Sequence, residues 1–457
     1  MRIWKFAVLI LCLLEFPVAL HATIFGTVQG VVQDAQHLAI TGAGVTLKAK
    51  NSDWTQVQKS NDSGAFKFSA VPIGDYIVTI TAQSFQPQQQ TLIVDSDTTL
   101  QVNFVLAVSS VSQNVVVSET PVTGIASTVT PTTMLAHQQI EQMPGATLTN
   151  SLNAITDYVP GAYVTHDMLH MRGGHQVSWL IDGVPIPNTN IASNLGPQID
   201  PKDIGYLEVL RGSYNADSGD RTYGVFNIVP QNGFEFNNNC DLVVTAGNFY
   251  QTDDQIGCGG HTGRFAYYAS LNGNRSNYGL QVPIEQTYHD AENGYGGFAS
   301  FMLNLDPKNQ FRIVASLRRD YYQIPYDPDP NSLGNQLLIA GGNSPSYGLR
   351  DSEREPDGYV AFSWVHTFNP NMVLTLSPFY HYNAADYVGG PNDFPVSSTV
   401  DQTAHYGGMQ ASVNVTFWRN ALQAGVYGFA QHQYNYFNNQ FILLKKSWET
   451  SRRRDLI

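Results

Sequence analysis

Charged residues are scarce in this chain, at 13% of its 457 residues, and the net charge is −13. Surfaces that bind nucleic acid are basic, so this balance argues against a nucleic-acid partner. Cysteine is rarer still, with three residues. No segment approaches the ~18 consecutive apolar residues that a membrane-spanning helix requires. Any membrane-embedded part would therefore have to be a closed barrel of strands.

Recognisable catalytic patterns are also missing from the sequence. It contains no GxSxG, HExxH, CxxC or P-loop pattern, so we expect neither enzyme activity nor a cofactor. His166, His170 and His175 lie close together in sequence. Neither a cysteine nor a second helical face supports them as metal ligands, so we expect no metal site.

The N-terminus has the three parts of a secretory signal. Arg2 and Lys5 supply the positive charge, Phe6 to Leu14 supply the apolar core, and a small-residue cleavage site ends at Ala22. We therefore expect residues 1–22 to be a signal peptide. The whole chain has 39 glycines and 12% aromatic residues, a composition typical of a large β-structure with many turns.

Residues 23–107 read as short strands separated by turns. Apolar and polar residues alternate in Ala65–Phe68 and Tyr76–Ile80, and turn signals recur at Asp62–Gly64 and Pro72–Asp75. This spacing predicts an all-β sandwich. The series G-x-V…A-x-V-x-L…D-S-G-x-F-x-F…V-P-x-G-x-Y resembles the carboxypeptidase-regulatory-like domain, a small immunoglobulin-like sandwich. The resemblance implies no peptidase activity.

Residues 131–236 combine predicted helices with short β-rich runs. Helices are expected at Gln138–Gln142 and Thr149–Asp157. The apolar runs Trp179–Ile181, Tyr206–Leu210 and Val225–Val229 lie beside tight turns and predict a small sheet. The segment therefore predicts a small α/β domain.

The particular residues in and around these runs are more informative than their apolar character alone. The series RG…LIDGVP…LEVLRG…YGVFNIV resembles the plug domain of TonB-dependent outer-membrane receptors. The resemblance implies import across the outer membrane, driven by a TonB-type energy-coupling protein. The implied surroundings are outer-membrane lipid and an extracellular ligand that is a siderophore, a glycan or a peptide. The motif residues are Arg172, Gly173, Asp182, Gly183, Glu208, Arg211, Gly212 and Gly224.

Two roles are open for the charged motif residues. In the family, such arginines anchor the plug to the barrel wall, and Asp182 and Glu208 are natural partners for Arg172 and Arg211. Alternatively, these residues fix turns inside the plug. The glycines permit backbone geometries that side chains would block.

A linker over residues 108–130 precedes the plug and is rich in Ser, Thr and Val. Within it, Val115, Val116, Val117 and Ser118 look like a TonB box, the segment that binds the energy-coupling protein. A short extended run of β-branched residues can add a strand to the sheet edge of a partner. Alternatively, Val115–Val117 extends the preceding sandwich.

From residue 237 to 457 the pattern changes to long alternating strands, as in Ala411–Phe417. Short turns alternate with long polar connections, which is typical of an antiparallel transmembrane β-barrel. Tyr321, Tyr322, Trp418 and Tyr436 fit interfacial positions. We expect about ten strands between Asp241 and Leu444. Receptors of this class close with 22 strands, so the barrel is expected to be C-terminally incomplete.

Two further alternatives stay open at this stage. Cys240 and Cys258 would face each other across a hairpin centred on Phe249, either as a disulfide or as two unpaired wall residues. The rival to import is a surface adhesion or interaction protein that uses the barrel only as an anchor, or a non-functional fragment. The sequence therefore predicts a mainly β fold with three parts: an immunoglobulin-like β-sandwich, a small α/β plug and the first part of a transmembrane antiparallel β-barrel.

Overall fold

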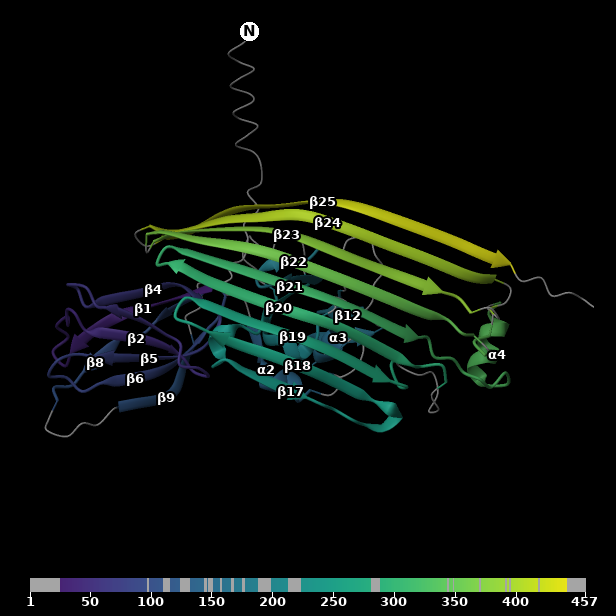
Figure 1. Ribbon diagram of the computed structural model, residues 1–457, viewed down its shortest axis with the longest axis horizontal. Coiled ribbons are helices and arrows are strands. Elements are labelled where there is room, and N and C mark those ends of the chain that lie inside the picture. Colours follow the sequence, from purple (N-terminus) through teal and green to yellow (C-terminus); the bar gives the residue numbers. More distant parts are fainter. Residues whose placement is uncertain are drawn as a thin grey trace, which may run out of the picture.

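Three bodies make up the computed structural model (Figure 1): a sandwich at one end, a long curved sheet, and a small domain held against that sheet. The structure describes residues 25–441 except for 97, 110–115, 124–131, 144–145, 147–150, 157, 166–167, 175–176, 188–198, 213–222, 281–287, 343–344, 348, 370, 391–392, 394–395 and 418–419. The mainly β fold class predicted from the sequence is confirmed.

The N-terminal sandwich has two sheets whose inward-facing residues meet in one core. One sheet has the order β4-β1-β7 with β8 also paired to β1, and the other has the order β3-β2-β5-β6-β9. Alternation places Leu47, Phe68 and Val78 inside, as expected for packed sheets. The strands are β1 (Phe25–Asp34), β2 (Gly44–Ala49), β3 (Thr55–Lys59), β4 (Ala65–Pro72), β5 (Gly74–Thr81), β6 (Gln88–Val94), β7 (Thr99–Gln101), β8 (Phe104–Leu106) and β9 (Val116–Thr123).

The small domain, called the plug below, contains a five-stranded sheet with the order β10-β15-β16-β13-β14. Helices occur close to both predicted positions. The elements are β10 (Thr132–Ala136), α2 (His137–Glu141), α3 (Ser151–Thr156), β11 (Ala162–Thr165), β12 (Met168–Met171), β13 (Val177–Ile181), β14 (Val184–Pro185), η1 (Pro201–Asp203), β15 (Ile204–Leu210), β16 (Gly224–Pro230) and η3 (Gly233–Glu235). In the described part of the chain, no helix has the length and apolar character needed to cross a membrane.

The central plug strands β15 and β16 are covered on both faces. Every residue of β16 is buried, and so is every residue of β15 except Leu210. Glu208 is therefore as deeply buried as its apolar neighbours Leu207 and Val209. Alternation is lost in a strand that has no solvent face. The plug sheet is therefore enclosed by its surroundings.

The curved sheet, called the wall below, has nine antiparallel strands in sequence order. The expectation of about ten was slightly high, because the last four strands have 18, 17, 22 and 22 residues rather than about ten. The elements are β17 (Asn239–Val243), η4 (Asn248–Tyr250), β18 (Thr252–His261), β19 (Phe265–Ser276), β20 (Glu292–Asp306), β21 (Asn309–Gln323), α4 (Leu333–Ala340), β22 (Ser352–Asn369), β23 (Met372–Val388), β24 (Val396–Phe417) and β25 (Asn420–Phe441).

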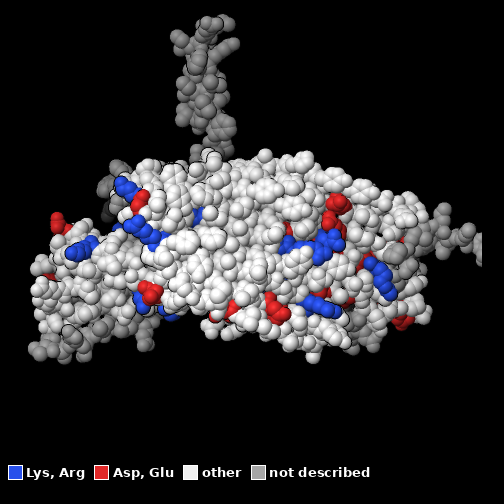
Figure 2. Space-filling model, viewed as in Figure 1, with Lys and Arg blue, Asp and Glu red and all other residues white. Residues whose placement is uncertain are grey.

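The two faces of the wall differ in chemistry. Ile313 and Leu317 of β21 are exposed, while Arg312 on the opposite face is buried against the plug. On β25, Leu422 and Val426 are likewise exposed. Figure 2 shows that charged side chains are sparse over the middle of the face turned to the viewer. The wall therefore has an apolar outer face and a mixed inner face, on which Arg312 lies beside buried apolar residues such as Val314 and Phe298.

Tyr322 corrects one expectation about interfacial residues. Its side chain is on the inner face, where its hydroxyl donates to a carboxylate oxygen of Glu355 at 2.9 Å. Tyr436, by contrast, is 45% exposed. Trp418 lies outside the described residues. A tyrosine near a strand end does not reveal its face, because a shift of one residue reverses the direction of the side chain.

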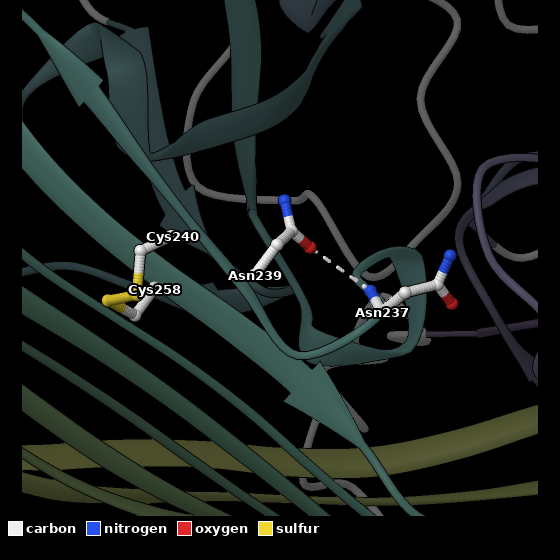
Figure 3. The surroundings of a disulfide bond; sticks show 4 residues. All are labelled: Asn237, Asn239, Cys240 and Cys258. Carbon is white, nitrogen blue, oxygen red and sulfur yellow. Dashed lines mark hydrogen bonds between the residues drawn. A yellow bond between two sulfur atoms is a disulfide. The ribbon is translucent and has the colours of Figure 1, made fainter.

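Cys240 and Cys258 form a disulfide, which decides between the two alternatives left open by the sequence (Figure 3). They stand directly opposite each other in the β17–β18 pair. The bond closes a loop with a sequence separation of 18 and fixes β17, a strand at the edge of the wall.

Replacing both cysteines with serine should lower the free energy of unfolding by about 3 kcal/mol, because the open chain regains loop entropy. Hydrogen exchange should accelerate first in β17. Urea unfolding in detergent and exchange mass spectrometry measure the two effects, with reductant added to the serine variant as the control. Unchanged exchange in β17 would show that the disulfide does not secure this edge.

Candidate functional site

The motif pairs Arg172-Gly173 and Asp182-Gly183 form two-residue turns. Arg172 and Asp182 have φ of 53° and 50°, and the glycines that follow have φ of 89° and 75°. The second turn joins the antiparallel strands β13 and β14, where Ile181 pairs with Val184. Positive φ at both central residues is the type I′ geometry that favours Asp-Gly. The turn-fixing role is therefore present in the structure.

Arg172 joins the two halves of the motif within the plug. Its Nη1 donates to the carbonyl oxygen of Arg211 at 3.0 Å. A Cβ on Gly212 would collide with the Arg172 guanidinium, so glycine leaves the space that this contact needs. Gly224 is similarly close to Met171. The described contacts of Arg172 thus organise the plug, and contacts with the wall come from other residues.

Asp182 provides the first of these wall contacts. Its Oδ1 lies 2.8 Å from Nη2 of Arg312 on β21, and both side chains are buried. Burial raises the pKa of Asp182, while the charge of Arg312 lowers it. The next residue, Gly183, donates its N–H to Asn227 Oδ1 at 2.9 Å. The turn therefore presents a carboxylate to the wall while its backbone is held by the plug.

A second group of wall contacts comes from η1, in a part of the chain that the sequence analysis did not single out. Lys202 Nζ lies 2.7 Å from Asp253 Oδ1 on β18 and 3.0 Å from Asp200 Oδ1. Arg318 of β21 approaches Asp200 Oδ2 at 3.5 Å. Removing one member of such a buried pair leaves an uncompensated charge, which costs about 3–5 kcal/mol.

Asp203 is the polar centre of this group, because four wall side chains donate hydrogen bonds to its carboxylate. The donors are Gln255 Nε2, Tyr268 OH, Ser270 Oγ and Asn272 Nδ2. Burial, followed by the nearby Asp200, raises the pKa of Asp203 to about 7, although the bonds from Ser270 and Tyr268 lower it. Some sequence signal existed: Asp200 caps η1 and Pro201 follows it, an order typical of a helix start.

His381 of β23 makes a further contact between the bodies. Its Nδ1 lies 2.8 Å from the carbonyl oxygen of Pro187, and its Nε2 lies 2.8 Å from Asp357 Oδ2. Plug and wall are thus joined by polar contacts at strands β18, β19, β21 and β23. They also share an apolar cluster, in which Phe298, Val314 and Phe379 of the wall pack with the core of the plug. A polar interface can exchange its bonds for bonds with water, so each net contribution is modest.

Glu208 has neither motif arginine nor the wall as its described partner. One carboxylate oxygen accepts from Ser96 N at 2.9 Å, and the other accepts from Ser96 Oγ at 2.8 Å. Asn227 Nδ2 adds a third bond at 2.6 Å. Burial raises the pKa of Glu208, and the bonds from Ser96 and Asn227 lower it. Since Ser96 belongs to the sandwich, this motif glutamate joins two domains.

The TonB-box candidate is placed at the sandwich edge. Val115 lies outside the described residues, but Val116, Val117 and Ser118 are in β9, which pairs in parallel with Gln88, Gln89 and Gln90 of β6. The backbone therefore adopts the alternative arrangement, in which the run extends the sandwich. β9 is the last strand in its sheet, so the described structure pairs it on one edge only.

His170, considered above as a metal ligand, stacks on Tyr163 with ring centroids 5.1 Å apart. His166 and His175 lie outside the described residues. Within the part of the chain that the structure describes, no group of three or more His, Cys, Asp and Glu side chains could hold a metal ion.

Arg312→Ala should loosen the plug by about 3–5 kcal/mol, because Asp182 would remain buried without its partner. Arg319→Ala, on the same strand but over the ring of Tyr295, is the matched control. Hydrogen exchange of β13 and β14 measures the effect. Equal exchange in the two variants would contradict a fastening role for the Asp182–Arg312 pair.

The seating of the plug should depend on pH through Asp203. Its folded pKa of about 7 exceeds the unfolded value of about 4. The stabilisation is therefore complete below about pH 4 and is lost as pH rises through 7. We expect faster proteolysis of the plug at pH 8 than at pH 5, and a smaller difference in Asp203→Asn. A variant with the wild-type difference would assign the pH dependence elsewhere.

Comparison with known proteins matches both small domains. Residues 27–107 match the family model described as carboxypeptidase regulatory-like domain, and residues 125–225 match the TonB-dependent receptor plug domain. Among curated proteins, none matches this chain significantly. Both resemblances inferred from the sequence are thereby confirmed, and the motif contacts described above belong to the plug.

Solved structures with a similar fold include, by their names, an import receptor and a transporter. The open form of the ferric-catecholate import receptor Fiu from E. coli K12 has a TM-score of 0.52 at 16% identity, covering 68% of this chain and 51% of that one. P. aeruginosa FpvA bound to a heterologous pyoverdine has a TM-score of 0.50 at 13% identity, with coverage of 70% and 44%. Unliganded ferric citrate transporter FecA has 0.50 at 12%, with 67% and 48%. This chain spans about half the length of these structures.

Proposed function

We propose that this chain, which carries a TonB-dependent receptor plug domain behind a carboxypeptidase regulatory-like domain, serves energy-coupled import across the outer membrane. The observation that supports this function best is how the plug is held. It is fastened to the concave side of the wall by buried polar contacts, of which Asp182–Arg312 and Lys202–Asp253 are the shortest ion pairs. The ion pairs can exchange their bonds for bonds with water when the plug is pulled, while the apolar cluster shared with the wall keeps the plug seated until then.

The outer face of the wall supports contact with outer-membrane lipid. Leu317, Leu422 and Val426 are more than half exposed to the surroundings. Tyr380 and His405, which are joined by a hydrogen bond of 2.7 Å, lie in the middle of β23 and β24. Apolar side chains exposed on the outer face of long antiparallel strands are typical of a lipid-facing barrel surface. The strands between the two edges of the nine-stranded sheet have hydrogen-bonded neighbours on both sides, which satisfies their backbone groups as lipid requires.

Energy would come from a TonB-type protein on the periplasmic side. Val115, Val116, Val117 and Ser118 are the proposed contact, because the edge strand β9 can accept another strand by main-chain hydrogen bonding. Pulling would then reach the plug, and the polar contacts with the wall would be replaced by contacts with water. This import requires no cofactor bound to the chain.

The ligand would enter from the opposite side, where the connections β19–β20 and β21–β22 are long. Siderophores, glycans and peptides are all candidate ligands. The names of the similar solved structures make a ferric chelate the first compound to test. A panel of the three classes, tested for binding and uptake, would identify the ligand.

Val116→Pro should abolish uptake of the identified ligand while leaving its binding unchanged, because proline removes a donor needed for strand pairing. Thr128→Pro, in the linker of residues 108–130 but outside β9, is the matched control and should retain uptake. Cells expressing each variant are compared for uptake and for ligand bound at the surface. Normal uptake by Val116→Pro would favour the rival function, a barrel-anchored adhesion protein.

A further inference from the structure

The sandwich contacts both the box strand and the plug, so it lies between them as well as before them in sequence. On one side, β6 pairs with β9 over Gln88–Ile93 and Val116–Thr123. On the other side, Ser96 follows directly after β6 and bonds to Glu208 on the central plug strand β15. Strand β6 of the sandwich thus connects the proposed TonB box to the central strand β15 of the plug.

The directions of the strands suit the transmission of a pull. β6 and β9 are parallel, and the box residues Val116–Ser118 pair with its first part, Gln88–Gln90. The end of β6 that approaches the plug is its last part, near Val94. A pull on the box away from the plug therefore loads the β6–β9 ladder along the strands. The register of the ladder shifts between Gln90 and Leu92, so the load is shared by two short stretches of hydrogen bonds.

The Ser96–Glu208 contact has several hydrogen bonds and is buried, so it can resist a pulling force. Both carboxylate oxygens are engaged, Glu208 is 1% exposed, and Asn227 fixes it from the neighbouring strand. Three hydrogen bonds from two domains restrain this buried carboxyl group, and each bond that is lost leaves a buried polar atom unsatisfied. Apolar contacts of Ile73 with Tyr206 and Val229 lie beside this contact. The sandwich is thus seated on the plug through a mixed interface.

A covalent route also joins β9 to the plug. Residues 124–131 connect β9 to β10, and eight residues can extend to about 26–29 Å before they become taut. The covalent route ends on β10, which pairs with β15 at Met134 and Glu208. Both routes therefore reach the same pair of plug strands.

We propose that the sandwich is a mechanical coupler, which transmits a pull on β9 to plug strand β15 through the Ser96–Glu208 contact. This role rests on the proposed import function. It gives the carboxypeptidase regulatory-like domain a purpose beyond spacing, because an unattached domain would let the linker straighten before the plug is loaded. Contacts with the wall, such as the Asp53–His261 pair at 3.1 Å, must release during the same motion.

Single-molecule pulling tests this role without ligand or partner, so its outcome is independent of whether import occurs. The purified full chain is immobilised in detergent by its wall and pulled through a handle on Asn114→Cys. In the otherwise unchanged chain, the plug should open while the sandwich remains docked. In Ser96→Ala and in Glu208→Gln, the sandwich should detach in a separate earlier step, about tenfold faster at a given force.

Two further variants separate the contact from general stability. Ser96→Thr retains the hydroxyl and should restore the original order of events. Ser63→Ala removes a sandwich hydroxyl that bonds only to Asn61 among the described contacts, and should behave as the parent chain. The proposal is overturned if the parent chain releases its sandwich before the plug moves, or if Ser96→Ala and Glu208→Gln leave the order and force unchanged.

Discussion

The buried polar interface between plug and wall is the constraint on which the rest of the structure depends. Charged groups such as Lys202 and Arg312 are stable out of water only when their partners are in place. Asp182 and Asp253 supply those partners from the facing body. The concave wall, the enclosed plug sheet and the turns that present Asp182 and Lys202 are all needed to bring these charges together.

The sandwich extends the same logic to a second interface. Glu208 belongs to the plug motif, yet its partner Ser96 lies in the other domain. Through β6 this contact also reaches the edge strand that carries the proposed box. The order of the domains in the chain would suggest independent units joined by linkers. The contacts instead show an assembly in which each domain packs against its neighbour.

Local patterns in the sequence were sufficient for the elements and for both domain families. Asp182-Gly183 specifies a tight turn, and the Cys240–Cys258 spacing specifies a hairpin, because short-range geometry decides both. The partners of the buried charges were not predictable in this way. Ser96 and Glu208 are 112 residues apart, and Lys202 and Asp253 are 51 apart. Only the packing of separate bodies selects such pairs, and no periodicity encodes it.

Disulfide trapping between plug and wall tests the central claim most directly. Asp203→Cys and Ser270→Cys replace two short buried side chains, one from the plug and one from the wall, whose polar atoms are in contact. In outer-membrane preparations, mild oxidation should join the two cysteines rapidly, and a membrane-impermeant thiol reagent should label neither before oxidation. Ready labelling of both thiols without cross-linking would show that the plug does not occupy the wall, and would contradict the account.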